Sequence, residues 1–111
     1  MIPQKVRDYF HYRVVRVRNK KSAPFTGTWL FGKVAGYWDG HSAIIYATTT
    51  ASEAQIQLAV AHERAHALLG HTAADATLEE ELNAWALTLK ILPKPFRTHE
   101  NLREIIRATT F

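Results

Sequence analysis

The sequence predicts an α+β fold, in which an N-terminal helix and a small antiparallel sheet of two to three strands precede three further helices. Before residue 50, aromatic and β-branched residues form runs bounded by Gly, Pro, Asn and Asp, as is typical of strands. After residue 50, apolar residues recur at helical spacing behind helix-start signals. A chain of 111 residues, 47% of them hydrophobic, suits one core, so we expect residues 1–111 to form a single domain.

The first part of the chain carries signals for a helix, a strand and a loop. Pro3 suits the first turn of a helix, where its missing N–H is not needed, and we expect this helix to run to about Tyr12. Arginine and valine then interleave over residues 14–18, which is typical of a half-exposed strand. Residues 19–26 are polar and contain a proline, so they predict a loop.

Two further segments predict a β-hairpin. Residues 29–38 and 43–48 are rich in aromatic and β-branched side chains. Asp39 and Gly40 between them are a strong hairpin signal, so the two strands are expected to pair antiparallel. We expect the strand at 43–48 to present a free edge to which an extended peptide can add.

The clearest predicted helix runs from about residue 53 to residue 69. Ser52 precedes it with Gln55 three residues later, which forms a capping box, and Gly70 marks its C-terminal end. The helix contains neither Pro nor Gly, and its apolar residues are mostly small. We therefore expect this helix to be well bounded and buried.

The pattern HExxH lies in the second half of this helix, with His62 and His66 four residues apart and Glu63 between them. Residues at i and i+4 lie one above the other on a helix face, so two imidazoles can share one Zn²⁺. The glutamate points beside the metal, where a water would sit. The pattern predicts zinc-dependent hydrolysis with Glu63 as general base.

A second helix is predicted after a short polar connection. Thr77 followed by Glu80 forms another capping box, and the helix is expected to end near Leu92 and Pro93. Because the connection is short, this helix and the HExxH helix should be antiparallel neighbours. Thr98 is expected to cap a last short helix. The apolar stripe of the second helix consists of Leu78, Leu82, Trp85 and Leu89.

A zinc ion held by two histidines needs a third protein ligand and one open position. The start of the second helix offers three candidates, Glu79, Glu80 and Glu81. Glu80 is engaged by the capping box, and the other two lie about 200° apart around the helix axis, so one of them faces the metal. The helical period does not decide between Glu79 and Glu81. Asn83 and the small Ala86 lie on the Glu79 side, where Asn83 would support a ligand through a hydrogen bond.

The two motifs together resemble the ImmA/IrrE metallopeptidases, a gluzincin-like group. The resemblance covers about residues 28–93 and is carried by the segments IIYATTTASEAQIQLAVAHERAHALLGH and EEELNAWALTLKILP. It implies a minimal zincin-like domain whose site residues are the zinc ligands His62, His66 and Glu79, the catalytic Glu63 and the supporting Asn83. Glu81 stays open as the alternative third ligand.

The remaining histidines do not complete another known zinc pattern. A metzincin would need Gly at position 69 and His at position 72, which are occupied by Leu69 and Thr72. His71 is therefore expected to be an exposed loop residue, and the same structural interpretation applies to His11, His41 and His99.

Composition limits the class of protein. No cysteine is present, so disulfides and thiolate metal sites are excluded, and zinc must be held by His and carboxylate groups. No apolar run approaches the ~20 residues that span a bilayer, and the N-terminus lacks a signal-peptide core, so we expect a cytoplasmic protein without membrane contacts. Residues 1–38 carry eight basic residues and one acidic residue. A solvated basic face is favoured over nucleic-acid binding, because no nucleic-acid motif accompanies the charge.

These observations predict a zinc-dependent endopeptidase that hydrolyses a peptide bond, with Zn²⁺ as its cofactor. The expected partner is a protein or peptide substrate, and the family resemblance implies a specific regulatory protein, such as a transcriptional regulator. Two other functions stay open. One is a catalytically idle zinc-binding interaction module, and the other, less favoured, is a basic nucleic-acid-binding protein.

Overall fold

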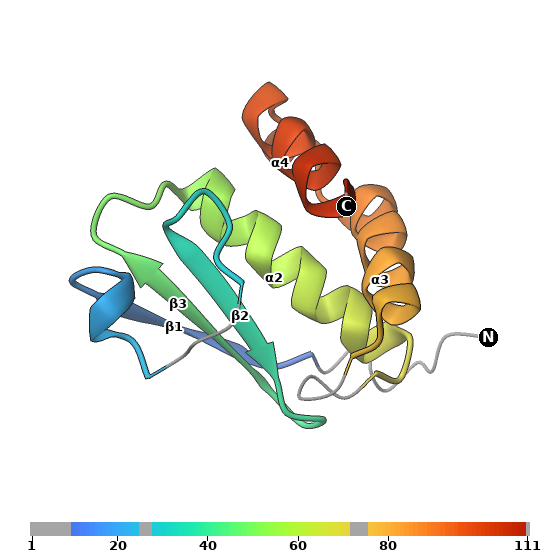
Figure 1. Cartoon of the computed structure of the whole chain (residues 1–111), viewed down its shortest axis with the longest axis horizontal. Helices are drawn as coiled ribbons and strands as arrows, with labels where there is room; N and C mark the ends of the chain where they lie inside the picture. Colours follow the sequence, from blue (N-terminus) through green and yellow to red (C-terminus); the bar gives the residue numbers. More distant parts are fainter. Residues whose placement is uncertain (1–9, 25–27, 72–75, 111) are drawn as a thin grey trace.

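The computed structural model describes residues 10–24, 28–71 and 76–110 (Figure 1). It has an α+β architecture, as predicted, in which a mixed three-stranded sheet is followed by three α-helices. The elements in order are β1 (Tyr12–Val17), η1 (Lys20–Ser22), β2 (Val34–Trp38), β3 (Ala43–Thr48), α2 (Glu53–Leu68), α3 (Leu78–Ile91), η3 (Lys94–Phe96) and α4 (His99–Thr109).

The sheet has the strand order β1-β3-β2, so β3 is its central strand. β2 pairs antiparallel with β3, as the hairpin signal predicts, whereas β1 pairs with β3 in parallel. The prediction of a purely antiparallel sheet is therefore wrong, because the long connection after β1 lets the hairpin insert β3 next to β1. The predicted free edge at residues 43–48 is wrong for the same reason. The edges of the sheet are β1 and β2.

The turn between β2 and β3 is held by an aspartate side chain. Asp39 Oδ1 accepts hydrogen bonds from the backbone N–H groups of His41 at 2.7 Å and Ser42 at 2.8 Å. These bonds stabilise the tight turn that the Asp-Gly pair predicts, because an Asp side chain can act as the hydrogen-bond acceptor in place of a backbone carbonyl. The hairpin prediction is confirmed.

The start of the described chain differs from its prediction. The helix expected from Pro3 to Tyr12 lies mostly outside the described residues, but Phe10 and His11 are not helical and Tyr12 already belongs to β1. The reason is contact with the sheet. The backbone N–H of Ala43 donates to the carbonyl of His11 at 2.9 Å, and the ring of Phe10 lies 5.6 Å from the ring of Trp38.

The strand expected at residues 29–38 begins later, at Val34. Leu30 pairs with Val34 across a tight turn in which Phe31 and Gly32 have φ of 58° and 68°. Two successive left-handed residues reverse the chain, which a continuous strand does not allow. The side chain of Glu104 on α4 accepts a hydrogen bond from the N–H of Phe31 at 2.6 Å and ties this turn to the last helix.

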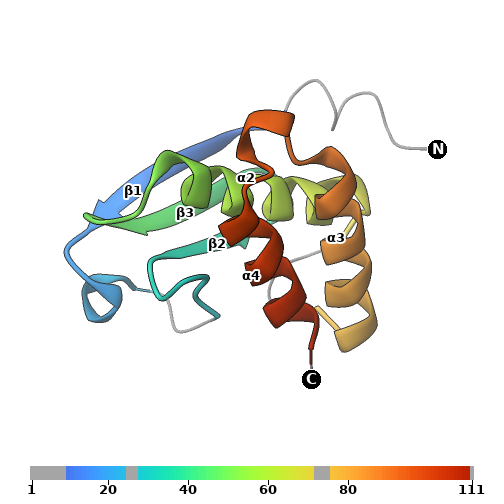
Figure 2. The same cartoon turned by 90° about the horizontal axis from the view of Figure 1, so that it is seen from above.

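Helix α2 forms the centre of the molecule. Both halves of its capping box are present, with Gln55 N–H donating to Ser52 Oγ at 3.2 Å and Ser52 N–H donating to Gln55 Oε1 at 2.9 Å. Gly70 has φ +74° just beyond the helix end, where a left-handed residue favours glycine. Most of α2 is buried, because it packs on β2 and β3 while α3 and α4 lie on the side away from β1 (Figures 1 and 2).

Helix α3 begins with the predicted Thr77–Glu80 capping box. Its apolar stripe is normally the face that a helix buries. Of this stripe Trp85 is buried, but Leu78, Leu82 and Leu89 are 57%, 37% and 42% exposed, and the other buried residues of α3 are Ala84 and Thr88. The helix is thus rotated relative to the expectation from hydrophobicity. Small and hydroxyl-bearing side chains face α2, which allows polar contacts with its histidines.

The last helix, α4, begins at the predicted cap. Thr98 Oγ1 accepts from the N–H of Asn101 at 3.1 Å, and the buried Asn101 side chain donates to the carbonyl of Ala54 on α2 at 2.9 Å. Asn101 therefore fixes α4 on the first turn of α2. Across the described residues, the helices are all too short or too polar to cross a membrane.

Candidate metal centre

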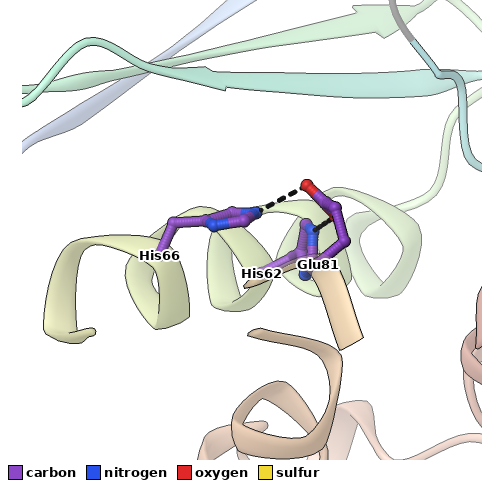
Figure 3. Close-up of side chains that lie close together, drawn as sticks. All are labelled: His62, His66 and Glu81. Carbon is purple, nitrogen blue, oxygen red and sulfur yellow. Dashed lines mark hydrogen bonds and ion pairs between the residues drawn. The ribbon is translucent and has the colours of Figure 1, made fainter. Parts of the chain in front are cut away.

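Two helices bring a cluster of three potential metal ligands together. His62 and His66 come from α2 and Glu81 comes from α3, and one ligand atom from each lies within 4.8 Å of the other two. His62 Nε2 is 3.2 Å from Glu81 Oε2, and His66 Nε2 is 3.0 Å from Glu81 Oε1. Figure 3 shows the carboxylate reaching over both rings, so that all three side chains converge on one point. Two imidazoles and a carboxylate can hold a metal ion.

The helical repeat of α2 places the two histidines. One turn separates His62 from His66, their ring centroids are 4.6 Å apart, and both residues are buried. The capping box and Gly70 fix where the helix begins and ends, and thereby where these rings lie against α3. The predicted pairing of His62 and His66 at one site is present in the structure.

The third member of the cluster is Glu81, the alternative ligand, and not Glu79. Glu79 and Asn83 are both exposed on α3 and do not belong to the cluster. The packing face of α3 explains this. Glu81, Ala84 and Thr88 recur at the spacing of one helix face, which is the face turned to α2, whereas Glu79 and Asn83 lie on another. The structure therefore brings Glu81, the alternative candidate, to the two histidines, and it does not bring Glu79 or Asn83 there.

Thr88 contacts the other nitrogen of His62 and thereby defines its protonation. Thr88 Oγ1 donates its one hydrogen to the carbonyl of Ala84 at 2.6 Å, so it can only accept from His62 Nδ1, which lies 3.2 Å away. The ring hydrogen of neutral His62 is thus on Nδ1, and Nε2 presents its lone pair to the carboxylate of Glu81. Two acceptors facing each other at 3.2 Å need a proton or a cation between them.

His71 contacts His66 from the segment after α2. The Nδ1 atoms of the two rings are 3.0 Å apart, and His71 Nε2 lies 3.7 Å from Glu80 Oε2. If the His71 hydrogen is on Nε2, which faces Glu80, His66 Nδ1 can donate to His71 Nδ1, while His66 Nε2 faces Glu81 at 3.0 Å. His71 is partly buried, so the expectation that it is an exposed loop residue is wrong. Histidine ligands commonly have such a partner on the second ring nitrogen.

Trp85 covers the side of the cluster that faces α3. Its ring stacks on the His62 ring with centroids 3.8 Å apart and planes inclined by 18°, and the residue is 5% exposed. The contacts of Trp85, Thr88 and His71 with the site were not predicted from the sequence. A signal for two of them was present, because Trp85 and Thr88 follow Glu81 at helical spacing.

The electrostatics of the cluster favour a bound cation. Burial acts to raise the pKa of Glu81, but hydrogen bonds with both histidines hold this pKa well below its ordinary value. Burial lowers the pKa of His62, despite its hydrogen bond with Glu81. Burial also acts to lower the pKa of His66, yet the hydrogen bond with Glu81 and the charge of Glu63 raise it overall. Since burial disfavours a proton on His62, a metal ion suits the space between His62 Nε2 and Glu81.

Glu63 lies on the neighbouring side of α2, against the sheet. It is 5% exposed and packs on Gly36 of β2, where a side-chain Cβ would lie 2.5 Å from Glu63 Cγ and 2.7 Å from Oε2. Gly36 therefore provides the space for this carboxyl group. Burial raises the pKa of Glu63 to about 7. Its proton exchange near neutral pH suits a general acid–base group.

Substituting Gly36 tests this close approach. Gly36→Ala is expected to lower the free energy of unfolding by about 1–3 kcal/mol, because Glu63 Cγ is near the helix backbone and cannot move aside freely. Urea unfolding of the variant measures the loss. The double variant Gly36→Ala/Glu63→Ala should recover part of the stability, since it removes the opposing atoms. A Gly36→Ala protein as stable as the wild type would contradict this packing.

Comparison with known proteins adds no relative, since neither a family model, a curated protein nor a solved structure matches this chain.

Proposed function

We propose that this protein is a zinc-dependent peptidase in which His62, His66 and Glu81 hold Zn²⁺ and Glu63 is the general base. The observation that carries the proposal is the convergence of three ligand atoms within 4.8 Å, with a separate buried carboxylate one residue from the first ligand. The lone pair of His62 Nε2 facing Glu81 supports a metal at this point rather than an internal hydrogen bond.

Zinc is favoured over other divalent metals by the donor set. Two imidazole nitrogens and one carboxylate are typical of catalytic zinc sites with an open position, whereas Mg²⁺ and Ca²⁺ prefer oxygen donors alone. Thr88 and His71 support this choice, because each engages the second nitrogen of one histidine ligand. A bound Zn²⁺ supplies a Lewis acid that polarises the scissile carbonyl and lowers the pKa of a water.

Two carboxylates of the protein have different roles in the proposed reaction. Glu63 takes a proton from the attacking water and later delivers it to the leaving amine, which balances the hydrolysis of a peptide bond. The packing of Glu63 on Gly36 excludes water from one side of the carboxyl group and keeps its side chain in one orientation. Without metal, interactions with the two histidines hold the pKa of Glu81 below its ordinary value, so its carboxylate is ionised and ready to bind a cation.

An extended peptide is the substrate that suits the neighbouring sheet edge. Along β2, pairing within the described chain is with β3, apart from the Leu30–Val34 bridge at its start. Gly36 belongs to this edge strand and carries Glu63 against its face, so a peptide that adds to β2 as a strand would lie next to the strand that holds the general base. By its resemblance to the ImmA/IrrE metallopeptidases, we propose a regulatory protein of the same cell as the substrate.

The test is cleavage of peptides by the zinc-loaded chain. A peptide library made from a whole proteome is incubated with wild type or Glu63→Gln, and mass spectrometry identifies new N-termini. Wild type is expected to cleave a defined set of peptides, and Glu63→Gln should retain zinc but cleave about 10²–10⁴ times more slowly.

An exposed glutamate on the same helix provides the matched control. Glu53→Gln changes the same charge on α2 without touching the cluster and should cleave like wild type. Equal cleavage by wild type and Glu63→Gln, or no cleavage by zinc-loaded wild type, would contradict the peptidase proposal. Stoichiometric zinc without cleavage would favour the interaction module.

A further inference from the structure

A second candidate site, lined partly by basic residues, lies beyond the N-terminal end of α2, away from the histidines. The end of β1, η1, the turn before β2 and the loop after β3 surround a hollow of about 540 Å³. Its described lining includes four basic residues, Arg18, Lys20, Lys21 and Lys33, and three consecutive threonines, Thr48 to Thr50, but no acidic residue. The segments that line the hollow lie at the end of the sheet at which β3 leads into α2 (Figure 1).

The segments that line this hollow are held together by hydrogen bonds in which the lysine side chains take no part. Arg16 Nη1 donates to the carbonyls of Thr48 at 2.9 Å and Ala51 at 3.3 Å, so β1 holds the loop after β3. The backbone N–H of Thr48 donates to the carbonyl of Lys33 at 2.9 Å, which joins this loop to the start of β2. The cap formed by Asn19 closes η1. The lining is therefore preorganised, and its ammonium groups remain available.

The four cations have no ion-pair partner in the part of the chain that the structure describes, where the ion pairs involve α2, the segment after it, α3 and α4. The nearest acidic residue along the chain after the threonines is Glu53, whose carboxylate accepts from the Gln57 side chain at 2.9 Å. Like charges gathered around one hollow repel each other, and a bound anion relieves this repulsion. The arrangement thus favours an anionic ligand.

We propose that this hollow binds the phosphate group of a small phosphorylated molecule. Phosphate offers several acceptor oxygens, which suit a lining of Lys, Arg and Thr donors better than the two oxygens of a carboxylate. A volume of about 540 Å³ falls among small-molecule pockets, which span roughly 300–1,000 Å³. The site shares no residue with the metal cluster, so it stands independently of the proposed peptidase function.

The test measures binding of pyrophosphate to the full chain by isothermal titration calorimetry. Wild type is expected to bind it, and Lys20→Ala/Lys21→Ala should weaken the affinity by about tenfold or more, because charge-assisted hydrogen bonds are lost. Both lysines are exposed, so the variant is expected to fold like wild type. In NMR spectra, pyrophosphate should shift the backbone signals of residues 48–50, and not those of α3.

A control variant and two other anions make the test specific. Lys90→Ala/Lys94→Ala removes the same charge from exposed positions outside the hollow and should bind pyrophosphate like wild type. A short single-stranded DNA weakened by the same lysine substitutions would also support a phosphate site, and the tighter of the two ligands identifies its source. Equal weakening in both double variants, tighter binding of hexaglutamate, or no binding of either phosphate compound would overturn the proposal.

Discussion

Glu81→Gln is expected to lower the zinc affinity of this chain by at least about 100-fold. Loss of a residue that only supports a metal ligand can already lower metal affinity by about 100-fold, and Glu81 would be a direct ligand. Glu79→Gln should leave the affinity unchanged, since Glu79 is exposed outside the cluster. An amide is a poor replacement for a carboxylate, because it carries no charge to balance the metal. Competition with a chromophoric chelator near neutral pH measures both affinities.

This pair of variants is closely matched. Both remove one negative charge from the first turn of α3, so the loss of favourable interaction with the helix dipole is similar in the two proteins. Circular dichroism of each variant checks that α3 is intact. Loss of zinc in Glu79→Gln with retention in Glu81→Gln would contradict the packing of α3 described here and would favour the ligand set implied by family resemblance.

The features that the sequence predicted well are local. The capping boxes at Ser52 and Thr77 and the Asp39 turn depend on side chains within three residues of the backbone groups that they bind. Such contacts form with little help from the rest of the chain, so they can be read from a short window. Local signals also set the ends of the helix that carries His62 and His66, and its predicted C-terminal end lies within one residue of the observed end.

The features that the sequence did not predict depend on contacts between distant segments. Hydrophobicity alone pointed to a face of α3 with three leucines and Trp85, yet the leucines are exposed and α3 buries Trp85 together with Thr88 against His62. The choice between Glu79 and Glu81 depends on this rotation. In the same way, Gly36 appeared as one strand residue among others, and its role as the space for Glu63 follows from the packing of α2 on β2.

Removal of the buried charge at Glu63 is expected to stabilise the metal-free protein at alkaline pH. Burial raises the pKa of Glu63 from 4.5 to about 7, so the folded state binds this proton more tightly than the unfolded state does. The favourable contribution of the neutral group is complete below pH 4.5 and is lost as pH rises through about 7. Above that pH, the buried carboxylate costs on the order of 3 kcal/mol.

Glu63→Gln removes this cost while keeping the shape of the side chain. The chelator-treated variant should be more stable than wild type by about 3 kcal/mol above pH 8, and the gain should vanish near pH 4. Urea unfolding across this range measures it, with Glu53→Gln as the control that shows no such trend. His66 and Glu81 also act on the Glu63 proton, His66 to lower its pKa and Glu81 to raise it. Zinc adds positive charge beside the carboxyl group, so loading the metal should shrink the gain. A gain that is independent of pH would mean that the pKa of Glu63 is the same in the folded and unfolded states, and it would contradict the burial of this carboxyl group.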